Sequence, residues 1–219
     1  MKQAVIFDMN GVLIDSESFW HEVTYDVYKK FSVPVENEDM HDTIGFKLEE
    51  AIQYWHNKYQ WENFDVQKTK EKMTNRMIEL VKADGTACNG VYSAIELLLK
   101  NNFTLGVASG SSATLVDAVL QKLNIKQYIA VAYSADTEPY GKPHPGTYLS
   151  AAKKLQCSPK DCIAVEDSPN GALSANRAGM KCILVPDQIA ITDKRFENIT
   201  PDLILNSLSE LTCNHLKNL

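Results

Sequence analysis

The feature that most constrains the fold of this chain is a series of short apolar runs separated by segments with helical spacing. The first run, Ala4–Phe7, stops at the acidic residue Asp8 and a glycine-containing turn, which is typical of a buried parallel strand. Later runs of the same kind lie at Thr104–Ala108, Ile129–Tyr133, Cys162–Val165, Cys182–Val185 and Leu203–Leu205. We expect each of them to form a strand.

Between these strands the apolar residues recur with the period of an α-helix. The predicted helices cover Ala113–Leu123, His144–Leu155 and Asn170–Ala178, and Gly179 closes the last one. Strands that alternate with helices pair in parallel, with helices on both faces of the sheet. The sequence therefore predicts an α/β fold with a doubly wound, Rossmann-like parallel sheet.

Residues 17–83 interrupt this rhythm. They are rich in aromatic and charged residues, show helical periodicity and carry few strand signals. Small and polar residues bracket the change of pattern, at Ser16-Glu17 and at Ala83-Asp84-Gly85, and are expected to act as hinges. We predict an α/β core made of residues 1–16 and 84–219, with an all-helical domain of residues 17–83 inserted in it.

Composition and charge narrow the class of protein. The chain has 219 residues, of which 44% are hydrophobic, and a formal net charge of -6. Nucleic acid is not an expected partner, because binding its phosphate backbone needs clustered Lys and Arg. The apolar runs are too short for a membrane span or a secretory signal, so we expect a cytoplasmic protein, with a monomer as its state. The five cysteines are scattered without metal-ligand spacing and are expected to be buried small hydrophobes.

Reactive side chains follow successive predicted strands. They are Asp8, Asn10 and Asp15 after the first strand, Ser109 after the second, Lys142 ahead of the helix at His144, and Glu166 and Asp167 after the strand that ends at Val165. The carboxyl ends of parallel strands share one edge of the sheet, where ligands bind. Singly, each residue has a structural explanation, such as a turn for Asp8 or a helix N-cap for Ser109 or Ser111. Together, carboxylates, a hydroxyl and a lysine can hold Mg²⁺ and a phosphoryl group.

These strand ends resemble the four signature motifs of the haloacid dehalogenase superfamily of phosphohydrolases. The motifs stand here as Phe7-Asp8-Met9-Asn10-Gly11-Val12, Ala108-Ser109-Gly110, Gly141-Lys142-Pro143 and Val165-Glu166-Asp167-Ser168. The resemblance covers essentially the whole chain. Further similarity to the branch of β-phosphoglucomutases and sugar-phosphate phosphatases lies in Asp15, Pro145 and Asp167-Ser168-Pro169-Asn170-Gly171. Similarity to bacterial 2-deoxyglucose-6-phosphatases lies in Asp15-Ser16-Glu17 with Trp20, Thr43-Ile44-Gly45 with Lys47, and Trp55 with Trp61.

The resemblance implies a nucleophile and a metal site. Asp8 would attack phosphorus, form an aspartyl-phosphate and also bind Mg²⁺. The backbone carbonyl of Asn10 and the carboxylate of Asp167 would complete the protein's ligands, with Glu166 as a further ligand or a group behind them. Lys142 would neutralise charge between Asp8 and the phosphoryl group.

The resemblance also implies the substrate contacts. Ser109 and the Gly110 amide would grip phosphate oxygens, and the inserted domain would be a helical cap that closes over the site and excludes water. Met9 and Asp15 are further expected contacts. Lys47 is the candidate contact to a substrate hydroxyl or distal anion, although a lysine beside two glutamates is more often a solvated helix face.

Asn10 departs from the family pattern. The family normally has Asp at this place, as general acid toward the leaving alkoxide and base toward the hydrolytic water, and an amide cannot transfer that proton. Its loss removes about 10² to 10⁴ in rate. Two accounts remain open: a substitution introduced to trap a substrate or phosphoenzyme, which the intact surroundings favour, or a natural variant that is slow, uses another acid or only binds.

The predicted function is that of a phosphatase of small sugar phosphates, such as 2-deoxyglucose 6-phosphate or a related hexose or hexitol phosphate. One alternative is a phosphomutase, which Leu48 and Trp20 disfavour because mutases would carry an arginine and a histidine there. The other is a sugar-phosphate binding protein disabled by Asn10. Trp55 and Trp61 are expected to be cap core rather than platforms that stack on a sugar.

Overall fold

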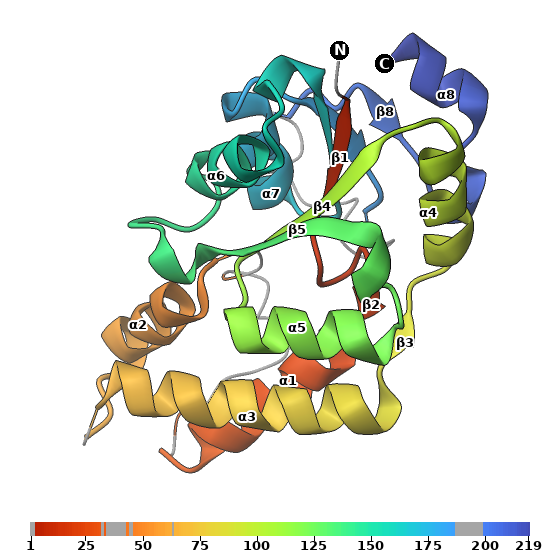
Figure 1. Ribbon diagram of the computed structural model, residues 1–219. Coiled ribbons are helices and arrows are strands. Elements are labelled where there is room, and N and C mark those ends of the chain that lie inside the picture. The colour runs from red at the N-terminus through yellow and green to blue at the C-terminus, as the bar shows by residue number, and fades with distance from the viewer. Residues whose placement is uncertain (1–2, 32, 34–42, 44–45, 63, 187–198) are drawn as a thin grey trace.

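The computed structural model describes residues 3–31, 33, 43, 46–62, 64–186 and 199–219. Within them six strands form one sheet in the order β5-β4-β1-β6-β7-β8, and every neighbouring pair is parallel. The strands are β1 (Ala4–Phe7), β4 (Thr104–Ser109), β5 (Ile129–Ser134), β6 (Cys162–Glu166), β7 (Lys181–Leu184) and β8 (Leu203–Ile204). The predicted α/β fold is confirmed (Figure 1).

Helices cover both faces of this sheet, which explains why its central strand is apolar throughout. Successive side chains of a strand point to opposite faces. Val5 and Phe7 of β1 pack in the core shared with α4 (Val91–Lys100) and α5 (Ala113–Lys122). Ala4 and Ile6 pack in the core shared with α6 (Gly146–Leu155) and α7 (Pro169–Arg177).

Two helix starts differ from the predicted ones because of proline. Helix α6 begins at Gly146 rather than His144, since a residue ahead of a proline, here Pro145, avoids helical backbone angles. Helix α7 begins at Pro169, because proline suits the first helical position and the Ser168 hydroxyl accepts a hydrogen bond from the Gly171 N–H. Helix α4, which follows Gly90, was not predicted, and neither were the bounds of α8 (Cys213–Asn218).

The secondary structure described in the inserted region is mainly helical, as predicted. It contains α1 (Glu17–Lys29), α2 (Leu48–Tyr59) and α3 (Val66–Asp84). Trp55 and Trp61 are 1% and 6% exposed, and the Tyr28 ring lies 6.1 Å and 5.5 Å from theirs. The tryptophans are therefore part of the cap's own core. Ile44 and Gly45 lie outside the described residues.

The two crossings between core and cap lie side by side. Two short strands, β2 (Ile14–Asp15) and β3 (Thr86–Ala87), form an antiparallel ribbon that sequence patterns did not predict. Beyond it, α3 runs along α5 (Figure 1). Lys122 of α5 donates hydrogen bonds to the carbonyls of Lys82 and Ala83, at 2.7 Å and 3.0 Å, and so satisfies the C-terminal end of α3.

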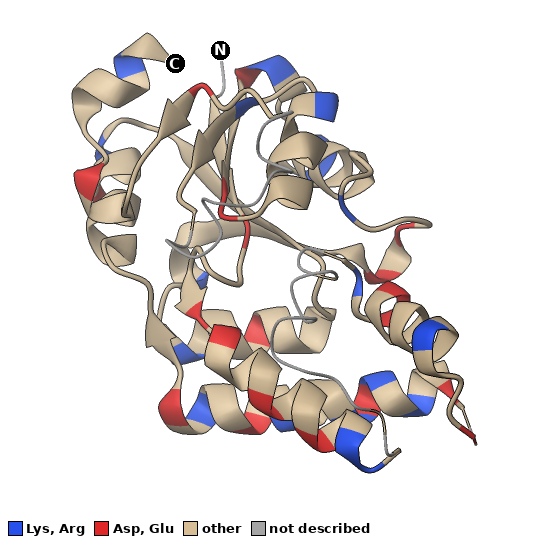
Figure 2. Ribbon diagram, turned by 180° about the vertical axis from the view of Figure 1, so that it is seen from behind, with Lys and Arg blue, Asp and Glu red and all other residues tan. Residues whose placement is uncertain are grey.

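The structure also bears on the expectations about surface charge, membrane spans and cysteine burial. Basic and acidic residues are interspersed over the ribbon (Figure 2). Among the described residues, no helix is both long and apolar enough to cross a membrane. Cys157, Cys162 and Cys182 are buried as expected, but Cys88 is half-buried and Cys213 is exposed, so the expectation of five buried cysteines is wrong for these two.

Candidate active site

The site lies where the three central strands of the sheet end. Strands β4 and β6 flank β1, and Phe7 at the end of β1 is in register with Val107 and Val165. The Asp8 N–H continues the ladder by donating to the Val165 carbonyl at 2.9 Å. Parallel register therefore brings Asp8 beside Ser109 and Glu166, the last residues of the flanking strands.

Lys142 joins these strand ends from the loop before α6. Its side chain is 2% exposed, and its ammonium donates to Asp8 Oδ1 and Glu166 Oε1, both at 2.5 Å, and to the Ala108 carbonyl at 3.2 Å. All three ammonium protons thus have acceptors, two of them carboxylates. The charges of Asp8 and Glu166 raise the pKa of Lys142 although burial acts in the opposite direction, so the residue is cationic at neutral pH.

Glu166 is held from three sides. It is fully buried, and the Tyr148 hydroxyl donates to its Oε1 at 2.6 Å. The Ser168 hydroxyl approaches Oε2 at 3.4 Å. Gly171 makes room for the carboxylate, because a Cβ there would lie 1.9 Å from Oε2. Sequence analysis missed Tyr148, whose place among the apolar positions of α6 made it indistinguishable from a core residue.

Three carboxylates converge on a place that suits a cation. Asp8, Glu166 and Asp167 each offer an oxygen within 4.8 Å of the others. Burial raises the pKa of Asp8 to about 6, with Lys142 opposing that shift, and burial followed by the charges of Asp8 and Glu166 raises the pKa of Asp167. One lysine cannot neutralise three carboxylates. Mg²⁺ prefers such oxygen ligands, so the donor set fits it.

A glycine shapes the Asp167 side of the cluster. Gly11 has φ +73, in the left-handed region, and a Cβ on it would lie 2.0 Å from Asp167 Oδ2. The turn after Asp8 can therefore pass against the Asp167 carboxylate only with glycine at this place.

The Asn10 side chain is hydrogen-bonded to two serines. Its Nδ2 donates to Ser111 Oγ at 3.0 Å, and the Ser16 hydroxyl donates to its Oδ1 at 2.9 Å. An aspartate could accept from both hydroxyls, so the surroundings of position 10 suit an acid as well as an amide. Ser111 is free for this contact because Ser112, not Ser109 or Ser111, is the N-cap of α5. Sequence analysis did not assign Ser16 or Ser111 to the site.

The other residues that were predicted to contact substrate differ in their burial and in their hydrogen bonds. Ser109 is fully buried, and its Oγ accepts the Ser111 N–H at 3.1 Å. Met9 is also buried, and its backbone N–H is a hydrogen-bond donor to the Asp8 carboxylate. Gly110 follows Ser109 in the same turn and is half-buried. Asp15 is exposed in the hinge ribbon, opposite Thr86.

The cap reaches the core through its charged residues. Lys47, predicted to contact substrate, is buried and donates from Nζ to the Glu138 carbonyl at 2.8 Å, in the loop between β5 and α6. Lys70 of α3 donates to Glu49 at 2.5 Å and to Asp136 of the same core loop at 2.7 Å. The described cap is thus attached to the loop that leads to Lys142.

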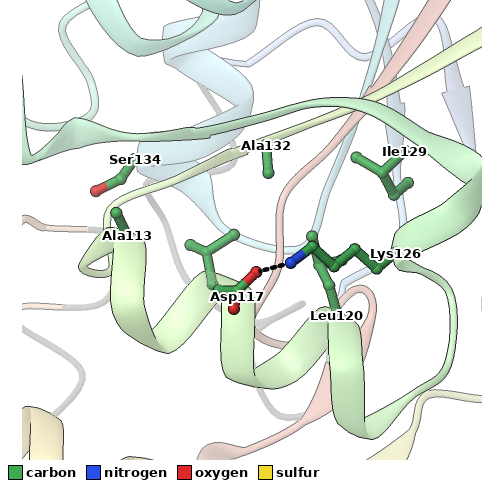
Figure 3. Close-up of a pocket in the computed structure, with 8 residues that line it drawn as sticks. Ala113, Asp117, Leu120, Lys126, Ile129, Ala132 and Ser134 are labelled. Carbon is green, nitrogen blue, oxygen red and sulfur yellow. Dashed lines mark ion pairs between the residues drawn. The ribbon is translucent and has the colours of Figure 1, made fainter.

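A separate hollow lies between α5 and β5 (Figure 3). It is lined by Ala113, Val116, Asp117, Leu120, Lys126, Ile129, Ala132 and Ser134. Lys126 and Asp117 pair with each other there at 2.5 Å. None of the lining residues belongs to the carboxylate cluster, so the hollow is not the candidate active site.

Known proteins match this chain along nearly its full length. The family described as "Haloacid dehalogenase-like hydrolase" matches residues 5–185. Hexitol phosphatase B of Escherichia coli (strain K12) is 35% identical over 97% of this chain and 96% of its own length. A phosphorylated carbohydrates phosphatase of Thermotoga maritima is 29% identical over 95% of this chain and 99% of its own.

Solved structures share the fold. CbbY from Rhodobacter sphaeroides, in complex with phosphate, superimposes with a TM-score of 0.88 at 22% identity, over 99% of this chain and 100% of that one. A β-phosphoglucomutase from Clostridium difficile gives a TM-score of 0.83 at 22% identity, over 99% and 96% of the two chains. At these identities the likeness concerns the fold, with its sheet core and helical cap.

Proposed function

The chain belongs to the haloacid dehalogenase-like hydrolase family, and we propose that it is a magnesium-dependent phosphatase of small sugar phosphates that works through an aspartyl-phosphate on Asp8. The observation that carries the proposal is the Asp8 carboxylate, held by Lys142 at 2.5 Å inside a cluster of three carboxylates. A hexitol phosphatase at 35% identity supports a hexitol or hexose phosphate as substrate, with 2-deoxyglucose 6-phosphate in the same class.

The geometry suits Asp8 as nucleophile. Lys142 binds Oδ1, which leaves Oδ2 to attack phosphorus while the ester P–O bond breaks. The leaving alkoxide then takes its proton from water, because Asn10 has none to give. Water then attacks the phosphorus of the aspartyl-phosphate, releases inorganic phosphate and regenerates the carboxylate. With a pKa of about 6, Asp8 is ionised at neutral pH, as the attack requires.

The phosphoryl group would be bound by groups that are already fixed. Lys142 contributes its positive charge, and the Ser109 hydroxyl lies at the end of β4, just before the turn that leads into α5. Backbone N–H groups at such a turn, including that of Gly110, favour phosphate oxygens. Because these groups are held in place before substrate arrives, little reorganisation is needed during the reaction.

Mg²⁺ would be held by Asp8, Asp167 and the backbone carbonyl of Asn10. When bound, it would neutralise charge on the phosphoryl oxygens and orient them. Glu166 shares its Oε1 between Lys142 and Tyr148, so we assign it mainly to positioning the lysine, with its carboxylate as a further candidate ligand of the cluster.

Asn10 sets the expected rate. The amide bonds Ser16 and Ser111 but cannot give a proton to the leaving alkoxide or take one from water. We expect Asn10→Asp to raise kcat about 10²- to 10⁴-fold, measured as phosphate release with Mg²⁺. Asn10→Ala is the matched control, because it removes the amide without adding an acid. A rate unchanged by Asn10→Asp would show that proton transfer does not pass through this position.

A panel of sugar phosphates tests the substrate class and the two alternatives. Incubated with the Asn10→Asp protein and Mg²⁺, a phosphatase releases inorganic phosphate, whereas a mutase returns an isomerised sugar phosphate. Binding of sugar phosphates without turnover of any phosphomonoester would favour the binding-protein alternative. A preference for nucleotides over every sugar phosphate would overturn the proposed substrate class.

A further inference from the structure

A glutamate of the cap is bonded to the backbone of the loop that carries the active-site lysine. Glu50 is the third residue of α2, where a side chain can accept from the backbone N–H at the helix start. Its Oε2 accepts from the Lys47 N–H at 3.3 Å, and its Oε1 accepts from the Gly141 N–H at 2.8 Å. One carboxylate therefore joins two backbone amides, one in the cap and one in the core.

Gly141 is in close contact with the N-terminal end of α2. A Cβ on Gly141 would lie 2.4 Å from Glu50 Oε2, 2.7 Å from Lys47 Cγ and 2.8 Å from the Lys47 backbone nitrogen. The Lys47 ammonium bonds the Glu138 carbonyl of the same loop. The start of α2 is thus docked on the peptide segment 138–141 by two hydrogen bonds from its side chains to backbone groups of that segment.

Lys142 directly follows Gly141 in the chain. Its ammonium reaches Asp8 and Glu166 at 2.5 Å, so its reach depends on where the Gly141 peptide lies. We propose that Glu50 is a positioning residue that uses the docked cap to hold the Gly141-Lys142 peptide, and with it the lysine ammonium, in place against Asp8. The proposal rests on the proposed function, because it gives the cap a part in setting up the nucleophile as well as in admitting substrate.

A glutamate that only capped its own helix would act differently. Its loss would weaken α2 and lower the melting temperature, but the chemistry at Asp8 would continue. A contact to substrate would also differ, because its loss would raise KM for sugar phosphates and leave small phosphate esters alone. A residue that positions Lys142 should affect kcat for every ester, since the lysine serves them all.

The test uses Glu50→Ala and Glu50→Gln in the full-length Asn10→Asp protein, with Gln53→Ala as the control on the exposed side of α2. We expect Glu50→Ala to lower kcat about 10- to 100-fold, for a hexitol phosphate and for p-nitrophenyl phosphate alike. Glu50→Gln should recover most of the rate, because its amide oxygen can still accept from Gly141. Gln53→Ala should keep the parent rate. An unchanged kcat in Glu50→Ala, or an equal loss in Gln53→Ala, would overturn the proposal.

Hydrogen exchange of the backbone amides gives a readout that needs no turnover. In the Asn10 protein, Glu50→Ala should speed exchange of the peptide that contains Gly141 and Lys142, with no change in the peptide that covers α5. Unchanged exchange would refute the docking whatever the activity. Absence of phosphatase activity in the Asn10→Asp parent would instead refute the proposed function, and exchange would still decide whether Glu50 holds the loop. Gly141→Ala, which adds a Cβ where Gly141 contacts Glu50 and Lys47, should give the same exchange pattern as Glu50→Ala.

Discussion

The carboxylate cluster of the core and the cap residues bonded to the loop between β5 and α6 are held in place in different ways. In the core, Asp8, Ser109 and Glu166 are set by strand register, so their relative positions follow from hydrogen-bonded backbone. In the cap, Lys47 and Lys70 reach across to a loop through long side chains. The core can thus carry out chemistry that needs fixed distances, while the cap can vary with the substrate. The comparison predicts that changes in the core abolish or slow turnover, and that most changes in the cap affect binding.

The largest effect is expected at Asp8. In the Asn10→Asp protein, Asp8→Asn keeps the size of the side chain but removes the nucleophile, so phosphate release should fall by at least about 10⁴-fold. A ³²P-labelled substrate should label the parent and leave the variant unlabelled. Hydrolysis at the parental rate would show that the core cluster is not the site of chemistry, and the comparison would fail at its first step.

A second prediction concerns competition between protons and the metal. The pKa of Asp8 is raised to about 6, so the carboxyl is protonated below that pH and must lose its proton before it can bind Mg²⁺. Because the pKa of Asp167, the second expected carboxylate ligand, is raised as well, affinity should fall by at least about tenfold per pH unit below pH 6. Calorimetric titration with Mg²⁺ at pH 7.5, 6 and 5 measures this, with circular dichroism to verify folding at pH 5. Constant affinity down to pH 5 would place the metal away from Asp8.

The strand ends could be predicted from the sequence because a short apolar run fixes both the strand and the edge where it ends. Asp8 and Asp167 needed only chain position and the rule that parallel strands bind ligands at their carboxyl ends, whereas Lys142 lies in a loop and needed its motif as well. The hinge ribbon could not be predicted, since each of its strands has two residues and no periodicity. Helix α4 was overlooked although Val91, Ile95 and Leu98 have helical spacing and are buried.

The contacts that support the site were much harder to predict. Tyr148 occupies an apolar position of α6, and only the rotation of that helix against β6 shows that its hydroxyl meets Glu166. Glu50 and Gly141 are 91 residues apart, and their contact depends on how the cap sits on the core. Sequence patterns give the period of a helix but not its rotation in space, so such partners emerge only from packing.

Tyr148→Phe tests whether a supporting residue of the core affects turnover rather than binding. It removes the hydroxyl that bonds Glu166 and leaves the ring, over which the Lys142 ammonium lies 4.9 Å from the centroid. A hydrogen bond to a charged group contributes about 1.5 to 3 kcal/mol. If about half of it serves to place Lys142, kcat in the Asn10→Asp protein should fall about 4- to 12-fold with little change in KM. Tyr92→Phe, whose hydroxyl bonds the Leu123 carbonyl on the surface, should keep the parental kcat. A rise in KM alone would assign Tyr148 to substrate binding.

The smallest effect is expected from the ion pairs between cap and core. Lys70 bridges Glu49 of the cap and Asp136 of the core, and Asp136 Oδ2 also accepts from the Ala113 N–H at the start of α5. Hydrogen bonds to Asp136 and Glu49 raise the pKa of Lys70, although burial acts against the charge.

Lys70→Met removes this bridge and keeps the length of the side chain. Because all three partners retain contact with water, we expect a loss of about 1 kcal/mol or less, seen as a few-fold rise in KM for sugar phosphates at an unchanged kcat. The same rise should appear in the parent when salt is added, since salt screens the pair. Lys100→Met, which breaks an exposed pair within α4, should leave both constants unchanged. A fall in kcat of Lys70→Met as large as that expected for Glu50→Ala would mean that the ion pair also holds the loop that carries Lys142. The contrast between a fixed core and an adjustable cap would then not apply to the cap residues that contact this loop.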